Sequence, residues 1–325
     1  MSDIIYNSYN YSLERKFEPL ADRKKLKNQP FTQVPQERNE AEAFFTENIS
    51  SSVGLTKIVF TNKNGWNDSK YSREYLTFEA LEDTTFTFTR NNLQYSVDGG
   101  ETWETLAANT ETPTITAGNK IMWKQTGLTP EPGYGIGTFS STGNFNVSGN
   151  IMSLYYGDEF IGQKDLTGKI SAFYVLFFGC NKLVNAENLI LPATTLEQNC
   201  YVAMFQGCTS LITAPELPAT TLADNCYNSM FYGCTSLTKA PELPATTLTN
   251  SCYQWMFEGC TSLNYIKCLA TDISASNCTS TWVENVNAEG TFIADSAEVG
   301  WFYDNSGIPS GWDAFDKDGN PINNS

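Results

Sequence analysis

Nine cysteines are the side chains with the most reactive chemistry in this sequence, and all of them lie between residues 180 and 278. Such a set could form disulfides or a thiolate metal site. C-x-x-C pairs, the usual spacing of zinc ligands, are absent. Seven cysteines instead recur every 26 residues on two ladders, which are Cys200, Cys226, Cys252 and Cys278, and Cys208, Cys234 and Cys260. We therefore interpret them as small buried side chains, each packed on its equivalent in the next repeat.

Composition restricts the remaining chemistry. The chain has no histidine, which excludes His-dependent triads, histidine general bases and zinc sites that need imidazole. Its net charge of −16 argues against nucleic-acid binding, because a phosphate-binding surface is basic. No apolar run is long enough to span a membrane, and residues 1–20 lack the basic and apolar regions of a secretory signal. We predict no catalytic residue, no cofactor and no bound metal.

Two short motifs suggest chemistry that we do not expect. SVDGGETW (96–103) resembles the Asp-box of sialidase propeller blades, where the motif recurs and forms a structural turn. Here it occurs once, and Asp98-Gly99-Gly100 suits a tight hairpin with Trp103 packed over it. DKDGN (316–320) matches half of a calcium loop but lacks the bidentate glutamate, so a polar turn is the simpler interpretation.

The chain repeats itself with a period of 26 residues. NCYVAMFQGCTSL (199–211) returns as NCYNSMFYGCTSL (225–237) and as SCYQWMFEGCTSL (251–263), each preceded by LPATTL. A unit of this length cannot bury its own apolar face, so neighbouring units must stack. This pattern predicts a solenoid.

Within one unit, Tyr201, Met204 and Phe205 have the i, i+3, i+4 spacing of one face of a short helix. We expect Asn199 to cap this helix and Gly207 to end it. The positions between the constant residues vary from copy to copy, and we predict that they face outward as a candidate binding face. These residues are Val202, Ala203, Gln206, Asn228, Ser229, Tyr232, Gln254, Trp255 and Glu258. Drift among the copies alone would scatter changes at the same positions.

The predicted fold class is β-rich α+β, in four parts. Residues 1–50 form an extended polar arm, and 51–137 a small immunoglobulin-like β-sandwich, with alternating segments at 56–60, 74–81, 84–90, 93–97 and 119–124. Residues 138–289 form the solenoid, with aberrant first and last coils. Residues 290–325 form a C-terminal cap.

The motif MF-x-GCTSL-x-x-AP resembles the BspA-type (Treponema-type) leucine-rich repeat over about residues 160–290. Members of that family are mostly surface proteins of gut and oral bacteria that bind host or bacterial partners. Similar repeats occur in structural proteins of phages that infect Bacteroidota. The resemblance therefore implies a binding surface in either of these two settings.

We expect a non-enzymatic phage virion protein, a head or tail fibre or decoration, located on the virion. Its partners would be other virion proteins, bound by the arm, and a host cell-surface glycan or protein, bound by the repeats; a homo-oligomer is left open. The alternatives are a bacterial cell-surface adhesin and, third, a carbohydrate-active enzyme. The candidate anchor residues are Tyr6, Tyr9, Tyr11, Arg23, Lys24, Lys25 and Lys27.

Overall fold

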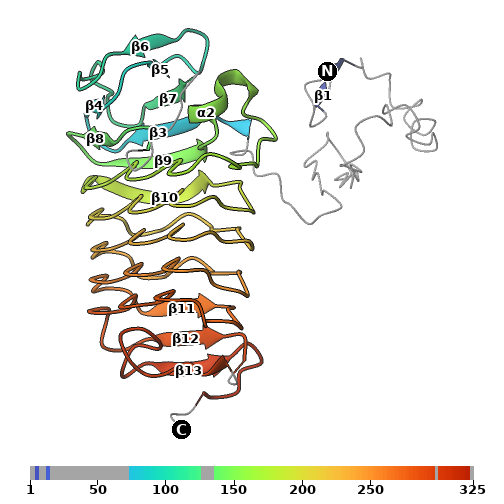
Figure 1. Cartoon of the computed structure of the whole chain (residues 1–325). Helices are drawn as coiled ribbons and strands as arrows, with labels where there is room; N and C mark the ends of the chain where they lie inside the picture. Colours follow the sequence, from blue (N-terminus) through green and yellow to red (C-terminus); the bar gives the residue numbers. More distant parts are fainter. Residues whose placement is uncertain (1–3, 7–11, 15–72, 126–134, 297–298, 323–325) are drawn as a thin grey trace, which may run out of the picture. The chain divides into compact units, whose positions relative to one another are not determined.

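The computed structural model describes residues 4–6, 12–14, 73–125, 135–296 and 299–322. The chain divides into two compact units, Met1–Asp68 and Ser69–Ser325. In the first unit, β1 (Ile4–Tyr6) and β2 (Ser12–Glu14) form an antiparallel pair. The expected strand at 56–60 lies outside the described residues. The second unit contains all the other described elements (Figure 1).

A mixed six-stranded sheet begins the second unit, with the strand order β10-β9-β3-β7-β5-β6. Its strands are β3 (Leu76–Ala80), β5 (Leu93–Ser96), β6 (Glu104–Leu106), β7 (Lys120–Gln125), β9 (Phe145–Asn150) and β10 (Leu183–Ile190). A second, two-stranded sheet consists of β4 (Phe86–Phe88) and β8 (Phe139–Ser141). The helix α2 (Ser153–Tyr156) and the 3-10 turn η2 (Gly157–Glu159) follow β9. Most pairings in the large sheet are antiparallel, but β9 and β10 run parallel.

Aromatic side chains hold the two sheets together. The Phe78 ring, on β3, lies 5.2 Å from the Phe86 ring, 5.3 Å from the Trp123 ring and 4.9 Å from the Phe139 ring, measured between centroids. All four side chains are buried. Offset and edge-on ring pairs of this kind add to the stability that burial of their area provides. The alternating sequence of the strands therefore forms one aromatic core.

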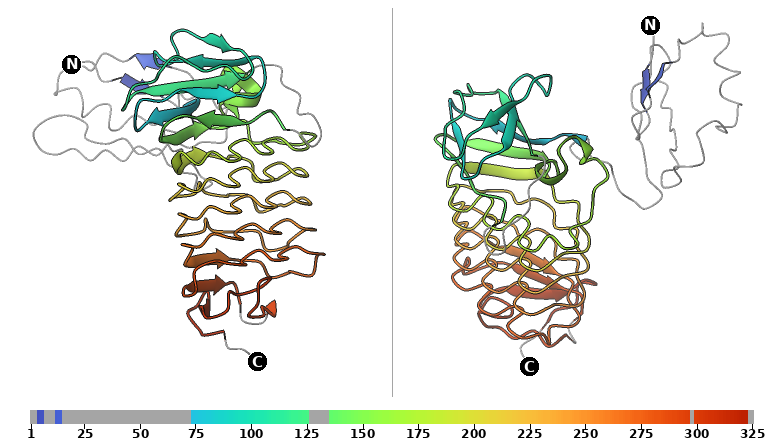
Figure 2. Two further views of the ribbon diagram at one scale, coloured as in Figure 1. Left: turned by 90° about the vertical axis from the view of Figure 1, so that its left-hand side faces the viewer. Right: turned by 45° about the horizontal axis from the view of Figure 1, so that its top comes forward.

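Beyond β10 the chain forms stacked turns, and one side of every turn extends the large sheet (Figures 1 and 2). Parallel bridges join Asn185 of β10 to Thr213, and Thr213 to Lys239. The next turn contributes β11 (Tyr265–Cys268), which pairs in parallel with β12 (Thr291–Ala294), and β12 pairs with β13 (Asp313–Asp316). The backbone ladder thus continues from the first sheet to the C-terminal strands.

The constant segment of each turn is a ribbon of consecutive β-turns. Its N–H groups alternate between two kinds of acceptor. Tyr201 N donates to Cys226 O in the next turn at 3.0 Å, whereas Met204 N donates back to Tyr201 O at 3.2 Å. The same alternation continues through Gly207 N, which donates to Tyr232 O at 2.8 Å. Half of the donors therefore bind the neighbouring turn, which they could not do in an α-helix.

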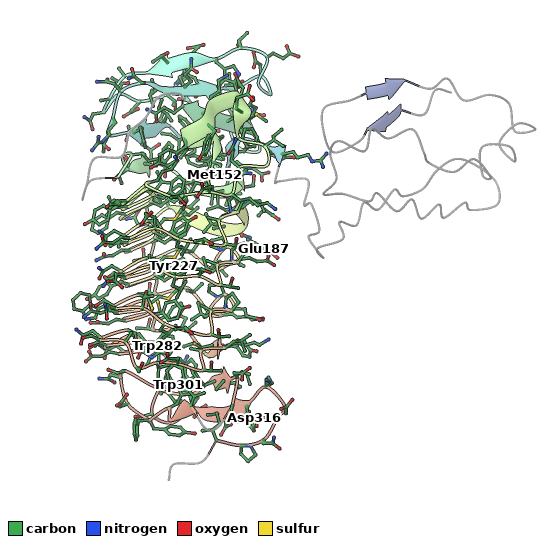
Figure 3. All side chains as sticks on the ribbon, turned by 45° about the vertical axis from the view of Figure 1, so that its right-hand side comes forward. Met152, Glu187, Tyr227, Trp282, Trp301 and Asp316 are labelled. Carbon is green, nitrogen blue, oxygen red and sulfur yellow. The ribbon has the colours of Figure 1, made fainter. Side chains whose placement is uncertain are left out.

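Two columns of stacked rings fill the interior. Phe177, Phe205, Phe231 and Phe257 follow one another with centroid separations of 5.4, 5.4 and 5.8 Å. A second column consists of Phe173, Tyr201, Tyr227, Tyr253, Trp282 and Trp301. Figure 3 shows Tyr227, Trp282 and Trp301 of this column in succession along the stack.

Both ends of the stack are covered. At the first turn, Phe177 stacks on Phe139 of β8 at 5.8 Å, and the Cys180 thiol donates to Phe139 O. At the last turn, Trp282 Nε1 donates to Gly307 O at 2.8 Å, and Trp312 Nε1 donates to Asn287 O at 2.7 Å. Capping is necessary because an open end would expose unpaired backbone groups.

The expected fold class is wrong. The structure is β-rich with mixed sheets, and α2 is the one short α-helix among the described residues. The expected helix at Tyr201, Met204 and Phe205 is the ribbon of β-turns, because positive φ angles at Asn199, Ala203 and Gly207 interrupt any helix. The described residues 73–125 and 135–137 do not form an immunoglobulin-like sandwich either, because the large sheet passes directly into the stacked turns and only β4 and β8 form a second layer. The α+β class with a leucine-rich-repeat solenoid is therefore replaced by an all-β description.

A core substitution in a middle turn tests the assignment of inner and outer positions. Phe231 is fully buried between Phe205 and Phe257, whereas its neighbour Tyr232 is 37% exposed. We expect Phe231→Ala to lower the free energy of unfolding by about 3–5 kcal/mol, because it leaves a cavity. Tyr232→Ala should have a much smaller effect. Denaturant unfolding of both variants measures the difference, and equally small losses would contradict the assignment.

Candidate binding face of the stacked turns

The turn ribbons place the variable residues in two outer columns. The first column consists of Phe178, Gln206, Tyr232, Glu258 and Glu284, and the second of Val175, Ala203, Ser229, Trp255 and Thr281. Backbone hydrogen bonds hold the first column in register, since Gly207 N donates to Tyr232 O and Gly233 N to Glu258 O, both at 2.8 Å. We call these two columns, with the adjacent Val202, Asn228 and Gln254, the outer face.

The predicted face residues differ in how far they reach solvent. Tyr232 and Trp255 are exposed, and Val202, Gln206, Gln254 and Glu258 are half-buried. Three others were expected to face outward, but the structure buries them: Ala203, Asn228 and Ser229. Ala203 and Ser229 are small side chains at tight turn positions, which accounts for their burial.

Two of the buried residues, Asn228 and Ser229, support the half-buried Gln254 of the next turn. Asn228 Oδ1 accepts a hydrogen bond of 2.8 Å from Ser229 Oγ, and Asn228 Nδ2 donates to Gln254 Oε1 at 3.2 Å. The side-chain oxygen of the half-buried Gln254 therefore accepts a hydrogen bond from the preceding turn. Its N–H donors are fixed in orientation as a result.

Trp255 combines exposure with a strained backbone. Its φ is +57°, and the equivalent Ala203 and Ser229 have φ angles of +52° and +56°. Left-handed backbone costs a residue with a side chain about 1–2 kcal/mol. The indole is 41% exposed, whereas the two equivalent side chains are buried. The same left-handed conformation recurs at Val175 and Thr281 of the second column, with φ angles of +53° and +54°, so it belongs to the turn itself, and the exposed indole is what distinguishes Trp255.

Burial raises the pKa of Glu258 above its usual value, and the like charge of Glu284 in the next turn raises it further. A hydrogen bond from Tyr232 opposes this shift by stabilising the ionised carboxylate. The first column thus joins an exposed phenol, a half-buried carboxylate and a second carboxylate in successive turns. The face is acidic at this end.

Four residues of the outer face were not among the predicted ones: Val175, Phe178, Thr281 and Glu284. Phe178 is 48% exposed and occupies the first column one turn before Gln206, and Glu284 occupies it one turn after Glu258. Sequence reasoning missed them because they lie in the degenerate first and last units, in which the constant residues of the motif are replaced. The aromatic pair at 177–178, aligned with Phe205-Gln206, was the available signal.

Most of the predicted anchor residues lie outside the described part of the chain. Tyr6 lies in β1, and its side chain is outside the described part of the chain. The remaining predicted anchor residues, Tyr9, Tyr11, Arg23, Lys24, Lys25 and Lys27, lie outside the described residues. Their role stays a prediction.

The Asp-box hairpin satisfies its own polar groups. Thr102 N donates to Asp98 at 3.0 Å, Gly100 N donates to Ser96 Oγ at 2.8 Å, and Trp103 Nε1 donates to Gly100 O at 3.1 Å. The hydrogen bonds from Thr102 hold the pKa of Asp98 well below its usual range. The carboxylate is therefore engaged in forming the turn. At the C-terminal motif, the Asp316 carboxylate likewise accepts from Asp318 N and Asn320 N.

The thiols are buried on both ladders and are free of disulfides. On the second ladder each thiol donates to a phenylalanine carbonyl of the preceding turn, as Cys234 Sγ does to Phe205 O at 3.1 Å. Burial raises the pKa of Cys180 and of Cys260 to about 12. These thiols are consequently protonated at neutral pH and lack the thiolate that nucleophilic or metal-binding cysteines need.

Within the described ranges, no group of three or more His, Cys, Asp or Glu side chains is placed to hold a metal ion. Nor does that part of the chain contain a helix with the length and apolar character needed to cross a membrane. Comparisons of the chain with protein-family models, with curated proteins and with solved structures found no match. The function is therefore argued from the geometry above.

The thiols provide a direct test of the interior. In the native protein at about pH 8, we expect iodoacetamide to modify the nine thiols only slowly, because burial and raised pKa values withhold the thiolate. After unfolding without reductant, all nine should react. Mass spectrometry counts the modified thiols, and fewer than nine after unfolding would reveal disulfides.

The carboxylates of the first column predict a pH dependence. Because the pKa of Glu258 is raised on folding, the folded state binds its proton more tightly, and stability falls as pH rises through this range. Glu258→Gln should remove this loss, so its stability relative to the wild type should increase between about pH 4 and pH 7. Urea unfolding across this range measures the trend.

Glu284→Gln is the matched variant, because it removes the like charge and leaves Glu258 in place. It should weaken the pH trend without abolishing it, since burial is the larger cause. A pH trend that is unchanged in both variants would show that neither carboxylate is responsible.

Proposed function

We propose that the chain is a non-enzymatic attachment protein whose stacked turns present the outer face to a partner on a cell surface. One contrast supports this proposal. Phe205, Phe231 and Phe257 are identical and fully buried. The residues that follow them, Gln206, Tyr232 and Glu258, differ in size, polarity and charge and form the outer column. A variable surface on a constant core is the arrangement by which repeat proteins bind.

The chemistry of the described residues is consistent with binding. The side chains that vary are amides, aromatics and carboxylates on a continuous, backbone-linked ladder. The thiols, which are the most nucleophilic groups when ionised, are buried and have raised pKa values. The Asp-box carboxylate is engaged by its own hairpin. The outer face is thus the surface on which we base the proposed function.

The setting that we propose is a phage virion, on which residues 1–50 bind other virion proteins and the repeats contact a host glycan or protein. The resemblance of the repeat to structural proteins of phages supports this setting. The basic cluster at Arg23, Lys24, Lys25 and Lys27 contrasts with the net charge of −16, and suits an acidic surface on a neighbouring virion protein.

The virion setting predicts that the protein copurifies with intact particles. Antibody detection in density-purified virions measures its content per particle. Replacing Arg23, Lys24, Lys25 and Lys27 with alanine in the full chain should lower that content several-fold, because the basic cluster is removed. The matched control replaces Lys239 and Lys267 of the stacked turns, and should leave the content unchanged. Absence of the wild-type protein from purified particles would refute the virion setting.

A further inference from the structure

The geometry points to an uncharged, linear glycan as the ligand of the outer face, lying along the stack with Trp255 and Tyr232 as its aromatic platforms. This inference rests on the proposed attachment function, and it specifies the chemical class of the partner. Four features of the described residues support it: the exposed rings, the oriented Gln254 amide group, the row spacing and the charge.

The rings of Trp255 and Tyr232 provide apolar platforms on the outer face, and Phe178 adds a third exposed ring two turns before Tyr232. Trp255 is 41% exposed and Tyr232 is 37% exposed, and they lie in consecutive turns, on the second and the first column. Trp255 presents a large ring at a position that is filled by the buried Ala203 and Ser229 in the two preceding turns. A pyranose ring has C–H groups on its faces, and these pack well against the flat face of an aromatic ring.

Polar groups surround these platforms in the pattern that sugar hydroxyls require. Gln254 precedes Trp255 and is oriented by its hydrogen bond from Asn228. Gln206 and Glu258 flank Tyr232 in the same column, and the phenol of Tyr232 is hydrogen-bonded to Glu258. Amide and carboxylate groups offer donors and acceptors side by side, as do the neighbouring hydroxyls of a sugar. In ligand sites, a small number of polar groups placed around an apolar surface fixes the orientation of the ligand and provides specificity.

The rows of the face repeat at the spacing of a glycan. Neighbouring turns are linked by backbone hydrogen bonds, so equivalent residues lie about 4.8 Å apart. This distance is close to the length of one sugar unit in an extended polysaccharide. A glycan that lies along the stack therefore meets one new row with each sugar, from Phe178 to Glu284.

The charge of the face selects against anionic ligands. Glu258 and Glu284 lie in consecutive rows, and the chain as a whole carries a net charge of −16. Sulfated, phosphorylated or uronic-acid glycans would be repelled, and so would nucleic acids. Neutral sugars need no counter-charge and can still use the Glu258 carboxylate as an acceptor. The charge therefore favours neutral glycans over the other extended polymers.

Titration calorimetry of the full chain with neutral oligosaccharide series, gluco- and manno-configured, tests the inference, with heparin as the anionic probe. We expect binding to at least one neutral series, with affinity that rises with length and levels off at about five sugars, one per row. Trp255→Ala and Tyr232→Ala should each weaken binding about tenfold or more, as aromatic anchors do. Ile212→Ala, which removes an exposed side chain elsewhere on the turns, should leave it unchanged.

The Trp255→Gly variant distinguishes a loss of binding caused by removal of the indole from one caused by a loss of stability. Glycine relieves the left-handed strain, so this variant should be at least as stable as the Trp255→Ala variant and still bind weakly. Tighter binding of heparin than of any neutral series would overturn the inference, and so would an absence of binding to both neutral series. If whole cells are then still bound in a Trp255-dependent manner, the attachment function stands and only the ligand class is wrong. Cell binding that is unaffected by Trp255→Ala and Tyr232→Ala would refute the outer face itself.

Discussion

The hydrogen bond between equivalent residues of neighbouring turns is the interaction on which this structure depends. In the ribbon of β-turns, every second N–H group, such as those of Tyr201 and Phe205, donates to the next turn, and the groups between them close the local β-turns. No turn can satisfy its own backbone, so each is stable only between two neighbours. The same hydrogen bonds place equivalent side chains of neighbouring turns in contact. Each inner position therefore needs a residue type that packs well against a second residue of the same type. Phenylalanine rings stack, and thiols donate to a carbonyl in the turn before.

This constraint separates core positions from surface positions within every turn. A change at Phe231 affects two neighbouring rings at once, whereas a change at Tyr232 next to it alters only the surface. The outer columns could therefore diverge while the inner ones stayed constant. Trp255 shows how far this divergence extends, because a tryptophan occupies the left-handed position that holds Val175, Ala203 and Ser229 in the turns before it. The backbone tolerates that strain because the neighbouring turns determine its conformation through hydrogen bonds on both sides.

Sequence reasoning identified the period, the inner residues and several strands, because these follow from repetition and alternation. The segments around Leu76–Ala80 and Lys120–Gln125 were expected as strands and are strands. The helix was wrong because apolar residues at i, i+3 and i+4 suit a ribbon of four-residue turns as well as a helix. Asn199 and Gly207, eight residues apart, tolerate positive φ angles and were the available sign of turns, but the residue between them, Ala203, gives no such sign. The burial of Asn228 could not be predicted either, since it depends on its contact with Gln254 in the next turn.

The first sheet covers one end of the stacked turns. A stack of turns exposes unpaired N–H and C=O groups at each end, and such an edge invites other chains to add to it. At one end β9 and β10 continue the ladder into a sheet whose aromatic core reaches Phe177 of the first turn. At the other end Trp301 stacks on Trp282, and Ile322 N donates to Ala314 O. The first sheet is therefore a structural part of the stack. It pairs with the first turn through the backbone and covers that end of the stack. Since both ends of the stack are covered, the sides of its turns remain open to solvent within the described part of the second unit, and the proposed recognition would take place there.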